Sequence, residues 1–188
     1  MPATLRQAAA HDADTLSALG IQVFLDTYAT DGIRPDLARE ALQEFSSAEW
    51  LDRLSQPQRR VVLAEVGRGL IGFAEVQLAP TPAPGTDTLG AELVRLYVQP
   101  AFQRSGVGTQ LIAAAEQMAQ SARLPSLWLT AWEGNHRALA FYARRGYADR
   151  GDTFYEIEGQ RYVNRVLQRM LGSPPSLGSD GSTAHPAA

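Results

Sequence analysis

Residues 90–122 constrain the fold of this chain more than any other stretch, because they combine a strand pattern, a glycine loop and a helix pattern in direct succession. Residues 93–98 form a run of apolar, aromatic and β-branched residues with the length of a buried strand. Pro100 ends this run, since proline lacks the N–H that strand pairing needs. From Val107 onward apolar residues recur at helical spacing. A helix that begins at such a loop points free N–H groups outward, and this favours binding of a phosphate or pyrophosphate.

The loop, QRSGVG over residues 103–108, narrows the kinds of phosphate site that fit. A Walker A loop requires lysine, and all 17 basic residues of this chain are arginine. A dinucleotide fingerprint requires a third glycine where this chain has Leu111. A simple tight turn remains an alternative use of the two glycines.

The pattern that remains, Gln/Arg-x-x-Gly-x-Gly/Ala between a strand and a helix, resembles the acetyl-CoA-binding motif of the GNAT superfamily of N-acetyltransferases. Residues 127–147, LWLTAWEGNHRALAFYARRGY, are similar to the strand and helix that follow in that family, with an Asn near the helix start and a Phe-Tyr pair near its end. The two segments have the right order and spacing. With weaker similarity before them, the resemblance covers about residues 3–170.

Composition agrees with one globular domain and limits its partners. A chain of 188 residues with 45% hydrophobic content suits a single domain, so we expect a GNAT domain over residues 1–172. Residues 173–188, rich in Pro, Gly, Ser and Ala, are expected to form a flexible tail. A formal net charge of −3 argues against nucleic acid as a partner. No apolar run approaches the length of a membrane span and no signal-peptide pattern is visible, so neither is expected.

The chain contains no cysteine, which excludes disulfides, thiolate zinc sites and a cysteine nucleophile. This composition is compatible with the cytoplasm, which is the location we expect. The three histidines lack metal-ligand spacing, so no metal site is expected.

The periodicity predicts strands and helices intermixed along the chain, which is an α/β (α+β) domain with a mixed sheet. Strands are predicted at residues 4–8, 60–66, 70–78, 93–98, 126–131, 147–150 and 162–170. Helices are predicted from about residue 12 to a break at residue 26, and at residues 36–45, 47–54, 107–122 and 135–145. Residues 79–90 are predicted as a loop, and residues 151–160 as a connection with a turn at residues 158–159. The resemblance implies the GNAT fold, a mostly antiparallel central sheet, flanked by helices and splayed around acetyl-CoA.

Tyr142 is the candidate acid. It follows Asn135 by seven residues, which is two helical turns, so both face the same way. In the GNAT pattern the Tyr of the Phe-Tyr pair stands near the CoA sulfur, which implies that Tyr142 protonates the leaving thiolate. The alternative is a packed aromatic residue on a half-buried helix.

Glu92 is the candidate base, because in some members of the family a Glu at this place relays the amine proton. Strand alternation puts Glu92 on one face with Val94, Leu96 and Val98, unless a bulge changes the parity. The alternative is a solvent-exposed carboxylate at a strand end.

The resemblance also implies a set of acetyl-CoA contacts. The Leu96 N–H would be the oxyanion donor, and the amides of residues 103–109 would hold the pyrophosphate. The implied cofactor-binding residues are Leu96, Tyr97, Val98, Gln103, Arg104, Ser105, Gly106, Val107, Gly108, Thr109, Asn135 and Tyr142. Asn135 could equally be a helix N-cap, and Arg137, Arg144 and Arg145 could either meet the 3′-phosphate or form a solvated face.

The acceptor wall is implied by the first two helices and the strand ends. The candidate residues there are Phe24, Asp26, Thr27, Tyr28, Asp31, Glu75, Trp132 and Glu133. Carboxylates beside aromatic rings suit a cationic amine, and the DTY segment with the later Trp-Glu-x-Asn resembles the polyamine-acetylating branch.

The resulting hypothesis is an acetyl-CoA-dependent N-acetyltransferase that acts on a small primary amine, such as a polyamine, by direct attack in a ternary complex. Two alternatives stay open, a peptide or protein N-acetyltransferase and a non-catalytic acyl-CoA-binding sensor. The resemblance leaves a homodimer as one option.

Overall fold

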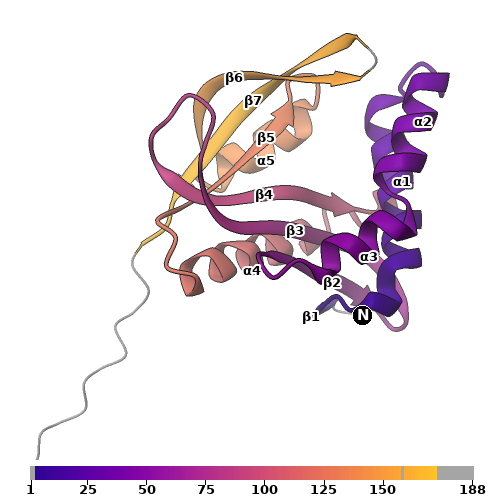
Figure 1. Ribbon diagram of the computed structural model, residues 1–188, viewed down its shortest axis with the longest axis horizontal. Coiled ribbons are helices and arrows are strands. Elements are labelled where there is room, and N and C mark those ends of the chain that lie inside the picture. Colours follow the sequence, from indigo (N-terminus) through magenta and orange to yellow (C-terminus); the bar gives the residue numbers. More distant parts are fainter. Residues whose placement is uncertain (1–2, 158, 173–188) are drawn as a thin grey trace, which may run out of the picture.

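The computed structural model describes residues 3–157 and 159–172, which form a seven-stranded sheet flanked by helices (Figure 1). The strands are β1 (Thr4–Gln7), β2 (Arg59–Val66), β3 (Gly69–Pro82), β4 (Leu89–Val98), β5 (Ser126–Trp132), β6 (Ala148–Ile157) and β7 (Gln160–Met170). The helices are α1 (Ala13–Tyr28), α2 (Pro35–Glu44), α3 (Ser47–Ser55), α4 (Val107–Ser121) and α5 (His136–Arg144), with short 3-10 turns η1 (Ala10–Asp12) and η2 (Pro100–Phe102). Predicted tail residues 173–188 and Glu158 of the predicted turn lie outside the described residues.

The strand order is β1-β2-β3-β4-β5-β7-β6, and within the described ranges β4–β5 is the one parallel pair. The predicted mixed, mostly antiparallel sheet is therefore confirmed. In the same ranges, no helix is long and apolar enough to cross a membrane.

The two faces of the sheet bury different side chains because successive strand residues point to opposite sides. On β2, Val62 and Ala64 pack in the hydrophobic cluster that includes α4. Val61 and Leu63 pack in the cluster that includes α1, α2 and α3. The sheet thus separates an α4 face from an α1–α3 face.

Strands β4 and β5 touch at one end and part at the other, as Figure 1 shows. Across the described residues their pairing is limited to Ala91 with Leu127 and Glu92 with Trp128. At the closed end, a Cβ on Gly90 would lie only 2.2 Å from Ser126 Oγ, so this position requires glycine. The divergence leaves a gap along the rest of β4.

A bulge at Val94 changes the parity of β4. Val76 pairs with Leu93 but the preceding residue of β3, Glu75, pairs with Arg95, so Val94 is the extra residue. Glu92 consequently shares the α1–α3 face with Arg95, whereas Leu96 and Val98 pack on the α4 face. The prediction that simple alternation places Glu92 with Leu96 and Val98 is wrong.

Several predicted boundaries differ from the structure, among them the start of β4, which is Leu89 instead of residue 93. Three further differences involve a tertiary contact, a local hydrogen bond or strand pairing. Helix α1 continues through the predicted break to Tyr28, with the Thr27 hydroxyl donating to the Val23 carbonyl (2.7 Å). Strand β3 extends into the predicted loop, where the Trp128 indole N–H donates to the Thr81 carbonyl (3.1 Å). Strands β6 and β7 pair over nearly the whole predicted connection 151–160.

Candidate active site between the diverging strands

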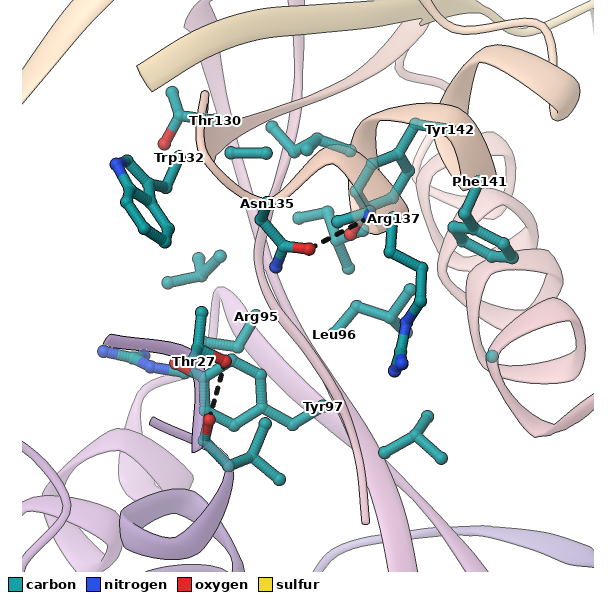
Figure 2. A pocket seen from close by; sticks show the side chains of 18 of the residues that line it. Thr27, Arg95, Leu96, Tyr97, Thr130, Trp132, Asn135, Arg137, Phe141 and Tyr142 are labelled. Atoms are coloured by element: carbon teal, nitrogen blue, oxygen red, sulfur yellow. Dashed lines mark hydrogen bonds between the residues drawn. The ribbon is translucent and has the colours of Figure 1, made fainter. Parts of the chain in front are cut away.

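A cavity of about 870 Å³ occupies the gap between β4 and β5 (Figure 2). Helices α1, α2 and α5, the glycine loop and strands β6 and β7 also contribute lining residues. The residues predicted from the sequence that line it are Phe24, Thr27, Tyr28, Glu92, Leu96, Tyr97, Val98, Gln103, Arg104, Gly106, Gly108, Thr109, Trp132, Asn135, Arg137, Tyr142, Arg144 and Arg145. Their roles remain predictions, but the fold brings them to one place.

The backbone of β4 turns unpaired groups toward this cavity. The Gln99 N–H donates to the Ile71 carbonyl of β3 (2.9 Å). Because the backbone groups of successive residues point to opposite sides of a strand, this hydrogen bond fixes which residues of β4 point toward β3. In that register the backbone groups of Leu96 and Val98 point away from β3. The Val98 carbonyl is met there by the Gln103 side-chain amide (3.1 Å). The Leu96 N–H and the Val98 N–H thus face the gap.

The glycine loop has the backbone of an anion site. Arg104 and Gly106 have positive φ angles of 64° and 87°, and Gly106 directly precedes α4. Left-handed residues in such a loop turn successive N–H groups into a concave surface. A Cβ on Gly106 would meet no described atom within 4 Å, so the loop leaves open space beside its backbone.

Two predicted cofactor residues do not line the cavity with their side chains. The Ser105 hydroxyl donates to the Phe102 carbonyl within the loop (2.5 Å). The Val107 side chain is buried in the core as the first residue of α4. The Val107 side chain is therefore unavailable to a bound ligand, and the exposed Ser105 hydroxyl is engaged as a donor within the loop.

Several arginines line the cavity. Arg104 comes from the loop, Arg137 and Arg144 come from α5, and Arg145, which follows α5, also pairs with Glu116 (3.9 Å). Figure 2 shows Arg137 reaching from α5 into the cavity beside Phe141. Several arginines around a concave backbone surface favour binding of a polyphosphate.

Asn135 and Tyr142 are held by α5. Asn135 is the N-cap, since its Oδ1 accepts from the Ala138 N–H (3.1 Å, dashed in Figure 2). Tyr142 is 7% exposed, and its ring packs against Phe141 and Tyr147. Burial raises the pKa of Tyr142, so its hydroxyl keeps its proton at neutral pH. A protonated phenol in a cavity can donate a proton or a hydrogen bond.

Glu92 lies on the opposite wall, at the start of the gap. Burial raises the pKa of its carboxyl group, and the negative charge of Glu75 acts in the same direction. Arg59 and Arg95 oppose that shift. Glu92 is therefore a carboxylate that holds a proton more tightly than an exposed Glu does.

A buried ion-pair network, which sequence reasoning missed, lies next to Glu92. Glu75 is fully buried and accepts from both Arg59 and Arg95. Arg95 also pairs with Glu44 of α2, and both Arg95 and Glu44 line the cavity. Glu75, a predicted acceptor-wall residue, thus lies beneath the wall with its charge balanced by two arginines. An arginine inside the apolar run 93–98 was the available signal, because a buried guanidinium requires carboxylate partners.

Aromatic rings form another part of the wall. Tyr28 lies 5.6 Å from Trp132 and 5.9 Å from Tyr162, measured between ring centroids. Trp132 covers Gly134, where a Cβ would lie 2.5 Å from the indole. Burial raises the pKa of Tyr28 to about 12, so this ring also stays neutral. The wall presents neutral π faces to whatever binds there.

The predicted acceptor acids lie elsewhere. Asp26 is exposed on α1 and does not line the cavity, because the helical turn of 100° per residue directs it away from Phe24 and Thr27. Asp31 and Glu133 are likewise exposed and outside it. The carboxylates that do line it are Glu44 and Glu92.

Two lining residues come from the β6–β7 hairpin, which sequence reasoning placed partly in a loop. Tyr155 of β6 donates its hydroxyl to Glu40 of α2, and Asn164 of β7 lies opposite Trp132. Asn164 stands among other polar residues in QRYVNRVLQRM, so no pattern in the sequence singled it out.

Comparisons with known proteins agree with this architecture. The model of the acetyltransferase (GNAT) family matches residues 25–147, which is more than half of the chain. An uncharacterized N-acetyltransferase from Lactobacillus delbrueckii subsp. lactis is 24% identical over 165 residues, which cover 88% of this chain and 95% of the relative.

Two solved structures share the fold. The PaiA N-acetyltransferase of Thermoplasma acidophilum, in complex with coenzyme A, has a TM-score of 0.70 at 20% identity, over 90% of this chain and 99% of that chain. The yncA protein of Salmonella typhimurium, with its cofactor acetyl-CoA, has a TM-score of 0.66 at 17% identity, over 95% of this chain and 99% of that chain.

Proposed function

The chain belongs to the GNAT family of acetyltransferases, and on that premise we propose that it transfers the acetyl group of acetyl-CoA to the primary amine of a small molecule. The observation that carries the proposal is the cavity between β4 and β5, which is lined by the glycine loop and by the aromatic residues Phe24, Tyr28 and Trp132. Such a cavity can hold two substrates end to end, so the transfer needs no acyl-enzyme.

The residues present fit acetyl-CoA. The open space at Gly106 and the arginines of the loop and α5 suit its phosphates. The backbone groups of Leu96 and Val98 can pair with the amides of the pantetheine arm, as an added strand would. When bound, acetyl-CoA supplies the acetyl group as a thioester.

The proton tasks are assigned to residues on opposite walls. A Lys-type amine has a pKa of about 10.4, so only a small fraction is neutral at pH 7. Glu92, whose pKa is raised by burial, accepts the amine proton. The Leu96 N–H donates to the oxygen that gains negative charge, and Tyr142 donates a proton to the departing sulfur.

The acceptor is assigned to the end lined by Phe24, Thr27, Tyr28 and Trp132. Neutral aromatic rings attract a cationic amine, and Glu92 adds a carboxyl group to the cavity, whereas Glu44 is already paired with Arg53 and Arg95. These features support a small cationic amine. Polyamines belong to this class, and the DTY and Trp-Glu-x-Asn segments place Thr27, Tyr28, Trp132 and Asn135 on the cavity.

The test is release of CoA thiol from acetyl-CoA in the presence of polyamines, amino acids, aminoglycosides or short peptides. We expect turnover with small cationic amines, and spermidine is the first to try. Turnover with peptides alone would overturn the acceptor class. Tight acetyl-CoA binding in calorimetry without thiol release on any amine would overturn the enzyme and favour a sensor.

A further inference from the structure

We propose that the side-chain amide of Asn164 binds the amine acceptor, by accepting a hydrogen bond from its N–H group. This inference rests on the proposed function and adds a residue from the last strand to the acceptor end of the cavity. It starts from a buried polar atom that the fold leaves without a partner.

The sheet register fixes where Asn164 lies. On β7 it is directly opposite Trp132 of β5 on one side and Thr153 of β6 on the other. Directly opposed residues project from the same face, so Asn164 lies beside Trp132. Both line the cavity. Because strands hold Asn164 on both sides, its backbone cannot withdraw.

The Asn164 amide is not satisfied by the protein. The residue is 8% exposed, and among the described residues its Oδ1 has no hydrogen-bond partner. A buried carbonyl without a partner costs roughly 1–3 kcal/mol. Its χ2 torsion is soft, so a rotation of the amide turns the oxygen toward the cavity at little cost. A hydrogen bond from a ligand N–H to this oxygen would remove the cost of the unpaired carbonyl.

The neighbouring groups favour an N–H donor over an acceptor. The π faces of Tyr28 and Trp132 attract cations. Of the polar side chains nearby, Asn135 Oδ1 caps α5 and the Tyr155 hydroxyl donates to Glu40, whereas the Thr130 hydroxyl also lines the cavity. Asn164 therefore supplies an oxygen with free accepting capacity beside a surface that attracts ammonium groups.

The experiment compares Asn164→Leu and Asn164→Asp with the wild type, using spermidine and whichever panel amine the wild type acetylates fastest. Leu has a similar shape but cannot accept a hydrogen bond, whereas Asp keeps an accepting oxygen. We expect Leu to raise the acceptor KM about tenfold, with the acetyl-CoA KM unchanged and the Tm not lowered. Asp should keep the acceptor KM within about threefold of the wild type.

Gln168→Leu is the matched control. Gln168 is a buried amide on the same strand and face, but it donates to Ser126 Oγ (3.0 Å) and does not line the cavity. Its replacement should lower the Tm and leave the acceptor KM unchanged, the opposite of Asn164→Leu. A structural role for Asn164 would make the two variants behave alike.

The outcomes separate this inference from the proposed function. Absence of wild-type turnover on every amine contradicts the function itself. Wild-type turnover with an unchanged acceptor KM in Asn164→Leu overturns the role of Asn164 alone. An Asp variant as impaired as the Leu variant overturns the accepting oxygen, because it means that the amide N–H is the group required.

Discussion

Tyr142 and Glu92 line one cavity, and the proposed function gives them opposite proton tasks. Burial disfavours the charged form of each group and so raises both pKa values. The phenol therefore keeps its proton at neutral pH, as the proposed acid requires. The carboxyl group binds a proton more tightly, as the proposed base requires.

Tyr142→Phe tests the acid. The variant keeps the ring in place but removes its proton, so we expect kcat to fall about 100-fold with little change in acetyl-CoA affinity. Steady-state kinetics and calorimetric titration measure the two quantities. Tyr147→Phe is the control, since its hydroxyl binds Glu116 (3.1 Å) outside the cavity. Equal kcat values in the two variants would refute the assignment.

Glu92→Gln tests the base through its pH dependence. The raised pKa means that wild-type kcat/KM should climb with pH as Glu92 loses its proton, at a pH above its ordinary value of 4.5. The Gln variant should lose roughly 100-fold in activity and lack this limb of the profile. Exposed Glu133→Gln should keep the wild-type profile. If kcat/KM of Glu92→Gln still rises with pH as in the wild type, another group accepts the amine proton.

The Glu92 carboxyl also has a stability signature. Because its folded pKa is raised, the folded state binds more protons than the unfolded state above pH 4.5. Ionisation of Glu92 therefore lowers the free energy of unfolding as the pH rises through the folded pKa. Glu92→Gln should remove that part of the decline in urea unfolding curves.

At this scale the sequence predicts helices better than strands. The seven-residue spacing of Asn135 and Tyr142 correctly places both on the cavity, because a helix has a fixed period. The face of Glu92 could not be predicted in this way, since one bulge residue, Val94, reverses the alternation. The roles of all three residues remain predictions.

At the scale of elements, the glycine loop and α4 decide where an anion can bind. The two glycines of the loop have different constraints. Gly106 has a φ of 87°, whereas a Cβ on Gly108 would make ordinary contacts with Phe141 and Val98 at 3.7 and 3.9 Å. The loop conformation therefore depends on Gly106, and Gly108 is an ordinary position in the first turn of α4.

Gly106→Ala and Gly108→Ala form a matched pair. The first places a side chain at positive φ, at a cost of about 1 kcal/mol or more, and fills the space beside the loop. We expect its acetyl-CoA KM to rise at least tenfold while the fold is kept. Gly108→Ala should bind acetyl-CoA normally and unfold at a slightly higher temperature. Equal acetyl-CoA affinities in both variants would show that the phosphates of acetyl-CoA do not bind at this loop.

The element order could be predicted from the sequence, and the ends of β3, α1, β6 and β7 could not. Local patterns fix periodicity, but these ends depend on distant contacts such as the one between Trp128 and Thr81. For the same reason, the sequence could not show that Tyr155 and Asn164 of the β6–β7 hairpin line the cavity. Their position depends on pairing across the sheet.

At the scale of the whole molecule, charged clusters join segments that are far apart in the chain. Arg6 of β1 binds both Asp12 of η1 and Glu65 of β2. Glu44 and Glu75 hold Arg95 between α2 and the sheet. Such pairs could not be predicted from one sequence, because no local pattern relates residues 51 or 59 positions apart.

Asp12→Asn tests the first cluster. Asp12 is 5% exposed, and the hydrogen bonds from Arg6 lower its pKa to about 2. A depressed pKa stabilises the fold above the ordinary value of 3.8, and this contribution is lost as the pH falls through 2. We expect the variant to lose about 2 kcal/mol of unfolding free energy at pH 7. Urea unfolding should show that the difference from wild type shrinks below pH 4.

The parting of β4 and β5 makes the sheet incomplete along its middle. A cosubstrate that pairs with Leu96 and Val98 would therefore act as a missing strand and become a temporary part of the architecture. Amide exchange at these two positions should slow when acetyl-CoA is added, while exchange at the permanent β2–β3 ladder stays unchanged. Free CoA carries the same pantetheine arm, so it would also fill the gap between β4 and β5. Each catalytic cycle would then end with the sheet coming apart, and the pace of that opening would limit how fast a product can leave.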